Sequence, residues 1–365
     1  MKKYILLLCV FVIYLTKSAH CQLVTNDNQF SEHKTLPFYS FKKRNNTALF
    51  QGNKKRNNYF EGWYFKMVSA NGNSIISVIP GISLADESGN QHAFIQLING
   101  VSSETYYYSF PIEDFYFSKK DFIVRIGENY FSEDSLRLNL DDGKHQVTAK
   151  VHMTNQTPFV LKRKKKAIMG WYRFVPFMQC YHGVVSLSHQ LSGKITINST
   201  EHHFQNGKGY LEKDWGSSMP EAWIWMQSNH FNNRHTSFML SVATIPWLGK
   251  TFTGFLGFLL YEGKIYRFAT YTNSELAVEM LNKNQLKIEI RSGEETILVK
   301  ATSKRTGELK APSNGAMNRR IAESIDASIH ISLLNKFDTE IYSDSSSITG
   351  LEMVGDINYM ISSIK

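Results

Sequence analysis

Apolar and polar residues alternate along much of this chain, and that period of two constrains its fold more than any other feature. Clear examples are residues 122–126, 136–140, 147–151, 286–290 and 329–333. In each, every second residue is apolar, as in a strand with one buried face. Residues that accept the positive φ angles of hairpins separate such stretches, at 71–73, 88–90, 141–144, 262–264 and 292–294. The pattern predicts an all-β protein of antiparallel barrels or sandwiches with little helix.

One stretch favours a short helix. In residues 316–327, Ile321 and Ile325 are four positions apart, which is the spacing of one helix face. We therefore expect this segment to be helical within an otherwise all-β chain.

A weak internal repeat indicates two halves. Residues 59–64 (YFEGWY) resemble residues 210–215 (YLEKDW), since both open with an aromatic, an apolar residue and a glutamate. The chain has 365 residues, enough for two domains of ordinary size, and 42% of them are hydrophobic, which excludes disorder as the main state. We expect an N-terminal β-domain over residues 58–204 and a C-terminal β-domain over residues 205–365.

The start of the chain has the pattern of a signal peptide. Residues 1–21 open with two lysines, continue with an apolar stretch at 4–15 that is short for a bilayer span, and end in a small-x-small site at 19–21. Cleavage would leave Gln22 first and send the protein into the secretory-pathway lumen or out of the cell; a signal anchor is the alternative. The polar residues 22–57 are expected to form a flexible arm.

Secretion gives meaning to two further features. Asn45 and Asn198 begin N-x-[ST] sequons, so both are expected glycosylation sites. The formal net charge is +9, and its densest cluster is the basic run at 162–166. In a secreted chain this run predicts a solvated loop, or contact with anionic glycans or a membrane surface, and no nucleic-acid partner. We expect a monomer.

Familiar catalytic and metal-binding motifs are missing from the sequence. It contains no phosphate-binding glycine loop, no nucleophile elbow and no His-Glu-x-x-His segment, and three cysteines are too few for a cysteine-rich zinc site. His202 and His203 are adjacent, so on a strand they would point to opposite faces. We expect no metal site.

An aromatic and amide-bearing face is the most informative pattern. Trp223, Trp225, Gln227 and Asn229 occupy alternate positions and would share one face of a strand. Two indoles followed by two amides suit a pocket for an amphipathic ring compound with an apolar tail. The alternative is a structural seam that closes a barrel.

Ionisable groups lie shortly before this face. Glu212, Lys213 and Asp214 precede Trp215. In the structural alternative, Glu212 is paired with Lys213 or an arginine. In the functional one, it is an acid in the pocket.

Taken together, several motifs resemble those of the tocopherol cyclase family. They run in the same order through residues 59–360 and comprise 59–66 (YFEGWYFK), 170–172 (GWY), 180–183 (CYHG), 212–216 (EKDWG) with its following tryptophans, and 350–356 (GLEMVGD). The resemblance implies two lipocalin-like β-barrel halves in tandem. It also implies an isomerase that closes the chromanol ring of a prenylated hydroquinone. Such a reaction needs no redox cofactor, because substrate and product are isomers.

The implied chemistry can be compared with the residues present. Ring closure requires a carboxylic acid kept protonated by burial, indole faces near the developing cation, and a polar group near the phenol. We prefer Glu212 as the acid, with Glu61 second; Asp214 is the third candidate, because the plant-type motif has an amide at its position. The expected substrate-binding residues are Trp63, Trp215, Trp223, Trp225, Gln227, Asn229 and His182.

A second reading keeps the fold without the reaction. The chain would then be a secreted lipid- or isoprenoid-binding protein whose partner is a small hydrophobic prenylated ring compound. A buried acid facing the indoles favours catalysis, whereas an entirely apolar interior favours binding alone.

Overall fold

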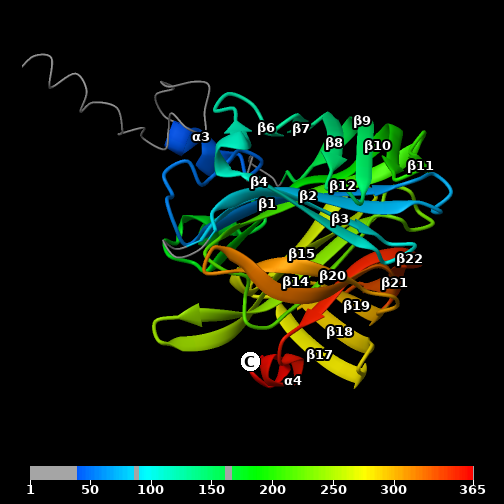
Figure 1. Cartoon of the computed structure of the whole chain (residues 1–365). Coiled ribbons are helices and arrows are strands. Elements are labelled where there is room, and N and C mark those ends of the chain that lie inside the picture. The colour runs from blue at the N-terminus through cyan, green and yellow to red at the C-terminus, as the bar shows by residue number, and fades with distance from the viewer. Residues whose placement is uncertain (1–38, 86–89, 161–166, 365) are drawn as a thin grey trace, which may run out of the picture.

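The chain folds almost entirely into two antiparallel β-sheets, as the alternation predicts. The computed structural model describes residues 39–85, 90–160 and 167–364. In Figure 1 the first sheet lies above, in blue to green, and the second lies below, in yellow-green to red. The stretches singled out by their period of two all lie in or overlap strands, and within β8 (Ser135–Asp141) buried and exposed residues alternate strictly from Leu136 onward.

Twelve strands make up the first sheet. In spatial order they are β4 (Thr105–Pro111), β3 (His92–Asn99), β2 (Ile75–Leu84), β1 (Tyr59–Val68), β12 (Gly207–Gly216), β10 (Cys180–Ile197), β9 (Gln146–Pro158), β8, β7 (Asn129–Ser132), β6 (Ile123–Ile126) and β5 (Phe115–Phe117), with β11 (Thr200–His203) paired to β10.

Ten strands make up the second sheet. In spatial order they are β16 (Lys264–Ala269), β15 (Lys250–Tyr261), β14 (Ser237–Trp247), β13 (Trp223–Ser228), β22 (Glu340–Val354), β21 (Ala316–Leu334), β19 (Glu295–Thr302), β18 (Gln285–Ser292) and β17 (Glu275–Asn282), with β20 (Gly307–Ser313) paired to β21.

Helices are few and short in the described part of the chain. They are α3 (Tyr39–Asn45), α4 (Ile357–Ser362) and the 3-10 turns η1 (Ile112–Asp114), η3 (Gly170–Phe174) and η4 (Thr270–Thr272). Among the described residues, no helix is both long enough and apolar enough to cross a membrane.

The helix predicted at residues 316–327 is wrong, because this segment forms the first part of β21. A spacing of four also places two side chains on the same face of a strand, so the isoleucines satisfied both patterns. Ile321 and Ile325 both lie in the apolar layer between the sheets. Pairing of β21 with β20 on one side and β22 on the other settles the extended form.

The two similar motifs lie side by side and not in separate halves. β1 pairs directly with β12, with Glu61 opposite Trp215 and Tyr64 opposite Glu212. β12 therefore belongs to the first sheet, and the chain enters the second sheet only between Gly216 and Trp223. The sequence had placed the division between residues 204 and 205.

Three apolar clusters organise the molecule. One consists mainly of residues of the first sheet and includes Trp63 and Phe65. Another consists mainly of residues of the second sheet and includes Ile224 and Met226. The third lies between the sheets and contains both Trp223 and Trp225. Successive residues of β1, β12 and β13 thus alternate between a sheet's own core and the layer between the sheets.

Part of the predicted flexible arm is built into the first core. Ala48, Leu49 and Phe50 are almost fully buried there. The indole N–H of Trp63 donates a hydrogen bond to the Ala48 carbonyl at 2.8 Å. Residues 46–57 are mostly polar in sequence, yet they contain this short apolar run, which lies in the core. The predicted signal peptide at 1–21, residues 22–38 of the predicted arm and the basic run at 162–166 lie outside the described residues.

Candidate functional site

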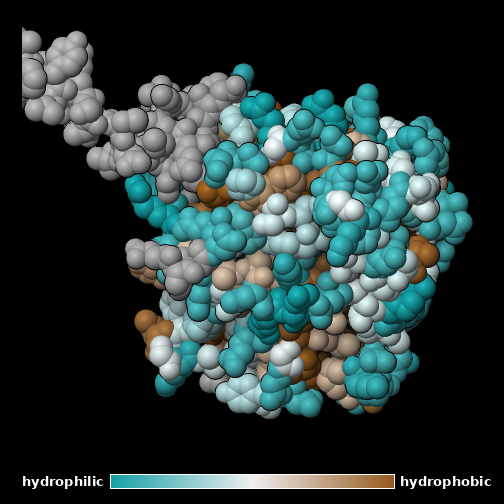
Figure 2. Space-filling model, in the orientation of Figure 1, coloured by the Kyte–Doolittle hydropathy of each residue, from teal (hydrophilic) through white to brown (hydrophobic). Residues whose placement is uncertain are grey.

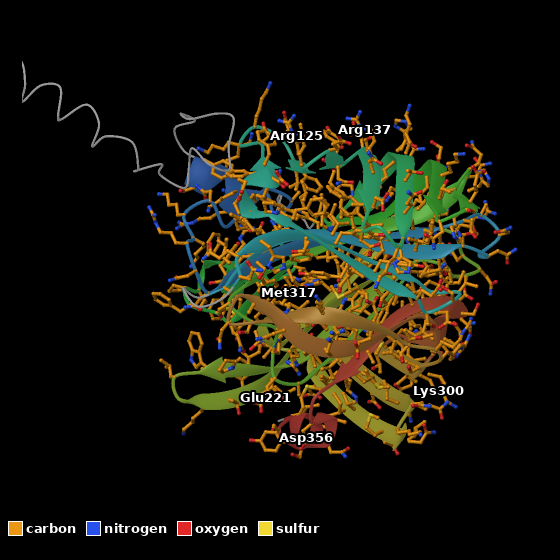
Figure 3. The ribbon with its side chains drawn as sticks, viewed as in Figure 1. Arg125, Arg137, Glu221, Lys300, Met317 and Asp356 are labelled. Atoms are coloured by element: carbon orange, nitrogen blue, oxygen red, sulfur yellow. The ribbon has the colours of Figure 1, made fainter. Side chains whose placement is uncertain are left out.

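A cavity of about 200 Å³ lies in the layer between the two sheets. Most of its wall is apolar, with side chains from both sheets such as Phe94, Leu256 and Ile321. Met317, labelled in Figure 3, also lines it and lies between the sheets, whereas Arg125 and Arg137 project from the far side of the first sheet. A largely apolar cavity with a few polar groups has the character of a small-molecule site.

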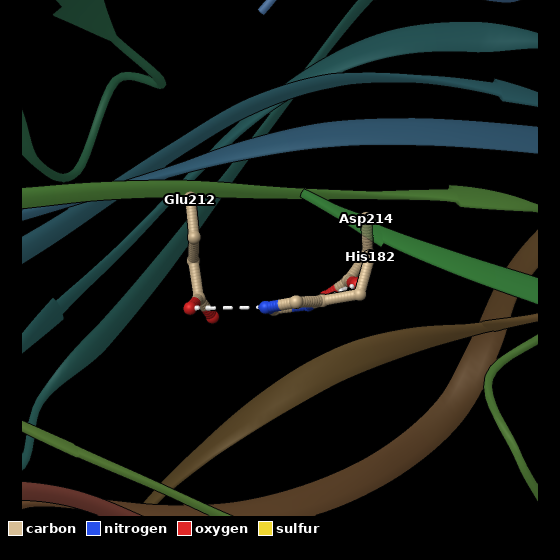
Figure 4. Close-up of side chains that lie close together, drawn as sticks. All are labelled: His182, Glu212 and Asp214. Carbon is tan, nitrogen blue, oxygen red and sulfur yellow. Dashed lines mark hydrogen bonds and ion pairs between the residues drawn. The ribbon is translucent and has the colours of Figure 1, made fainter. Parts of the chain in front are cut away.

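The wall on the first sheet carries a histidine between two carboxylates. Glu212 and Asp214 alternate on β12 and point into the cavity, and His182 comes from the adjacent strand β10. His182 Nδ1 is 2.8 Å from Asp214 Oδ1, and His182 Nε2 is 3.4 Å from Glu212 Oε2 (Figure 4). Tyr210 donates a hydrogen bond to Glu212 at 2.6 Å.

The two carboxylates make His182 a cation near neutral pH. Burial on its own lowers the pKa of this imidazole, but the charges of Glu212 and Asp214 outweigh burial and raise it to about 10. The three side chains are close enough to suggest a metal site, lying within 4.8 Å of one another. However, each carboxylate faces a different ring nitrogen, so the imidazole itself fills the centre of the group.

The wall on the second sheet carries two further acids. Glu323 on β21 is fully buried, and Tyr64 from the first sheet donates a hydrogen bond to its Oε1 at 2.5 Å. Its Oε2 is also buried and has no hydrogen-bond partner among the residues that the structure describes. Glu352 on β22 lies opposite Glu323 and opposite Trp225 in the strand register, and it accepts a hydrogen bond from the indole of Trp223.

Both of these acids hold a proton more tightly than an exposed carboxyl group. Burial raises the pKa of Glu323 to about 7, although the hydrogen bond from Tyr64 and the charge of Lys66 act in the opposite direction. Burial, followed by the charge of Glu323, raises the pKa of Glu352 well above its usual range. A buried acid that is protonated near neutral pH therefore faces the indoles in this cavity.

The expected aromatic and amide face is divided between two places. Trp223 and Trp225 both line the cavity, and the indole N–H of Trp225 has no partner within the described part of the chain. Gln227, further along β13, and Asn229, just after that strand ends, are fully buried and lie outside the lining. Gln227 accepts a hydrogen bond from Lys66, and Asn229 donates one to the Gly209 carbonyl. These two amides connect the sheets.

Glu61 lies on the opposite face of the first sheet. It forms a fully buried ion pair with Lys213 and accepts hydrogen bonds from the backbone N–H groups of Gln51 and Gly52. Lys213 therefore pairs with Glu61 and not with its neighbour Glu212, because adjacent strand residues face opposite ways. This position gives Glu61 a structural role in holding residues 51–52.

Trp63 and Trp215 also point into the first core and not into the cavity. The ammonium group of Lys213 lies 4.7 Å from the ring centre of Trp63 and 5.0 Å from that of Trp215. Trp215 in addition stacks on Tyr181, with ring centres 5.6 Å apart. These indoles stabilise a buried cation, which is a structural use of the same chemistry that was expected for substrate.

Sequence reasoning missed Glu323, Glu352 and Tyr64. Glu352 stands within the motif at 350–356, so the resemblance could have brought it forward. Glu323 was missed because we expected a helix at residues 316–327, and that expectation did not show that the Glu323 side chain points into the cavity. The two expected glycosylation positions, Asn45 and Asn198, are both exposed; their modification stays a prediction.

Comparison with known proteins identifies a family that this chain matches. The tocopherol cyclase-like family model matches residues 139–355. The chain is 27% identical over 156 residues to the probable chloroplastic tocopherol cyclase of Oryza sativa subsp. japonica, covering 41% of this chain and 33% of that protein. It is 28% identical over 119 residues to the chloroplastic tocopherol cyclase of Zea mays, covering 31% and 25%. The alignments thus span a third or less of these relatives.

A solved structure shares the fold. CghA, crystallised with Sch210972, superposes with a TM-score of 0.50 at 10% sequence identity, covering 82% of this chain and 89% of CghA. At that identity the likeness shows the fold alone, and it agrees with the all-β architecture of tandem barrel-like halves.

Proposed function

Since the chain belongs to the tocopherol cyclase-like family, we propose that it closes the chromanol ring of a prenylated hydroquinone by proton-initiated cyclisation. The observation that carries this proposal is Glu323. It is a fully buried carboxyl group with a pKa raised to about 7 and one oxygen without a partner in the described residues, and it lines the same cavity as the indole of Trp225.

The first step is protonation of the alkene. The carboxyl group of Glu323 gives its proton to the less substituted alkene carbon of the prenyl chain and becomes a carboxylate. The remaining alkene carbon is then a tertiary carbocation. Trp223 and Trp225 lie on the same wall, and a desolvated indole face stabilises such a cation by about 1–2 kcal/mol. We therefore move the donor role from Glu212, our preference from sequence, to Glu323.

The second step closes the ring. The phenolic oxygen forms its C–O bond to the cation and releases its proton. Glu212, which lies beside His182 and lines the same cavity, takes up this proton. Asp214 holds the other ring nitrogen and keeps His182 in place. One proton leaves Glu323 and one is taken up by Glu212, so the ring closure balances without an oxidant or reductant, and proton exchange with solvent after product release restores both groups for the next cycle.

The aliphatic wall suits the rest of the substrate. Side chains such as Phe94, Leu256 and Ile321 offer an apolar surface to a prenyl tail. The same wall also supports the second candidate function, which is binding of an isoprenoid lipid without turnover. The acids in the cavity favour catalysis, since an apolar lipid gains nothing from buried carboxyl groups.

The test is incubation with a panel of prenylquinols, with bound lipid and cyclised product read by mass spectrometry. Glu323→Gln keeps the shape of the side chain but removes its transferable proton, so binding should persist while turnover falls by ~100-fold or more. Glu221→Gln is the matched control, because Glu221 is exposed and outside the cavity lining. The control should be fully active.

Parallel variants assign the roles. Glu352→Gln tests the neighbouring acid and Glu212→Gln tests the base. Full activity in Glu323→Gln would refute the donor assignment. If the unmodified protein binds prenylquinols and converts none, the cyclase proposal fails and the lipid-binding function takes its place.

A further inference from the structure

Two loop tips near the cavity carry large apolar side chains that are exposed to solvent. Phe177, between η3 and β10, is 99% exposed, and Leu248, at the turn between β14 and β15, is 89% exposed. Trp247, which adjoins Leu248 in the chain, is also exposed. Phe177 and Leu248 border one shallow depression, so tips far apart in sequence form one surface, here called the apolar tips.

The position of the tips relates them to the cavity. Tyr172 and Met178, next to the first tip, line the cavity, and so do Pro246 and Phe252, next to the second. In Figure 1 the yellow-green hairpin of β14 and β15 projects at the left of the molecule, and Figure 2 shows hydrophobic surface at this projection. The apolar tips therefore stand beside one end of the cavity.

Folding stability does not explain these side chains. An exposed leucine or phenylalanine buries almost no apolar area. In addition, Leu248 and Phe177 have φ angles of 48° and 63°, a left-handed conformation that non-glycine residues adopt at a cost. Hairpin turns with this geometry prefer Asn or Gly. The chain thus carries strained, exposed apolar residues at two converging tips.

The charge around the tips selects one kind of partner. Residues 170–179 and 245–252 contain Arg173 and Lys250 and no acidic residue. Exposed aromatic and aliphatic side chains flanked by cations are the composition that inserts into the interface of an anionic bilayer.

We propose that the apolar tips dock the protein on the surface of an anionic phospholipid membrane. Phe177, Leu248 and Trp247 enter the boundary between headgroups and acyl chains, and Arg173 and Lys250 meet the lipid phosphates. Docking rests on exposure, geometry and charge. A further consequence rests on the proposed function: docking would bring the cavity to the membrane in which a prenylquinol dissolves.

Vesicle sedimentation with the full chain tests the proposal. Vesicles of phosphatidylcholine with phosphatidylglycerol should bind the protein more tightly than phosphatidylcholine alone. The double variant Phe177→Ser with Leu248→Asn should bind at least about tenfold more weakly, because two apolar anchors are lost. Asn accepts a positive φ, so thermal unfolding should show that the variant still folds.

A matched control is available at the other end of the second sheet. Phe337 is 76% exposed in the turn between β21 and β22, and Phe337→Ser should bind vesicles like the unmodified protein. Equal binding by the double variant, or an equal loss in the control, would overturn the proposal. So would a dimer in solution that binds no vesicles and that the double variant abolishes.

Cyclisation of a prenylquinol dispersed in detergent keeps the two proposals apart. Neither Phe177 nor Leu248 lines the cavity, so the double variant should retain this activity. Vesicle binding without any cyclisation would leave docking standing and remove the cyclase. Cyclisation without vesicle binding would do the reverse.

Discussion

The raised pKa of Glu323 makes a quantitative prediction about stability. Its ordinary value is 4.5, and in the folded protein it is about 7. The folded state therefore keeps a proton that the unfolded chain releases between these values. The contribution of this group to the free energy of unfolding is fully present below about pH 4.5 and is lost as the pH rises through 7. At 1.36 kcal/mol for each pKa unit, the loss amounts to about 3 kcal/mol.

Glu323→Gln isolates this effect, because a glutamine stays neutral throughout. Urea unfolding of both proteins should be measured between about pH 5 and about pH 7.5, where roughly 2–3 kcal/mol of the change falls. Over that range the variant should gain stability relative to the unmodified protein. Burial lowers the pKa of Lys66 to about 7, so its own effect on stability begins near that pH, and the part of the curve below about pH 6.5 reports Glu323.

Two outcomes would refute the reasoning. Parallel stability curves would mean that Glu323 titrates as an exposed acid and is unsuited to give a proton near neutral pH. A relative loss of stability by the variant as the pH rises would mean that the folded state favours the carboxylate, with Lys66 as its partner.

Two further predictions follow from the walls and the core. Lys213→Met should lower the free energy of unfolding by about 3–5 kcal/mol in urea titrations, since it leaves Glu61 buried without its ion-pair partner. Adding Glu61→Gln to this variant should recover part of the loss. If the losses of the two single variants simply added in the double variant, this reasoning would be contradicted. Trp225→Ala should weaken binding of an apolar prenylquinol and also cost about 3–5 kcal/mol of stability. Unchanged lipid affinity in a folded Trp225→Ala protein would place the site elsewhere.

The fold could be predicted from the sequence because its signal is local. Alternation along residues 135–141 or 286–290 reports which side of a strand is buried, whatever lies on that side. The helix expected at 316–327 failed for the same reason, since two isoleucines four apart share a face in either structure. Strand pairing is not local, so the contact between β1 and β12 could not be read from their similar sequences.

The site was harder to predict because a sequence pattern shows that a residue is buried but does not show which residues it packs against. Trp63 and Trp223 look alike in sequence, yet one packs within the first core and the other lines the cavity. Glu61 and Glu323 are both fully buried. Only the structure shows that Glu61 is paired with Lys213, whereas an oxygen of Glu323 has no partner among the described residues.

The motif at 212–216 shows how one sequence pattern serves two purposes. Glu212 and Asp214 face the cavity and hold His182, whereas Lys213 and Trp215 face the first core and form part of its buried cation site. Because successive residues of a strand point to opposite faces, half of such a motif faces the cavity and half faces the scaffold. Shared motif letters therefore do not identify a catalytic residue by themselves. Measurements can distinguish the two kinds of residue. Conservative changes at Glu212 should lower turnover, whereas changes at Lys213 should lower the free energy of unfolding.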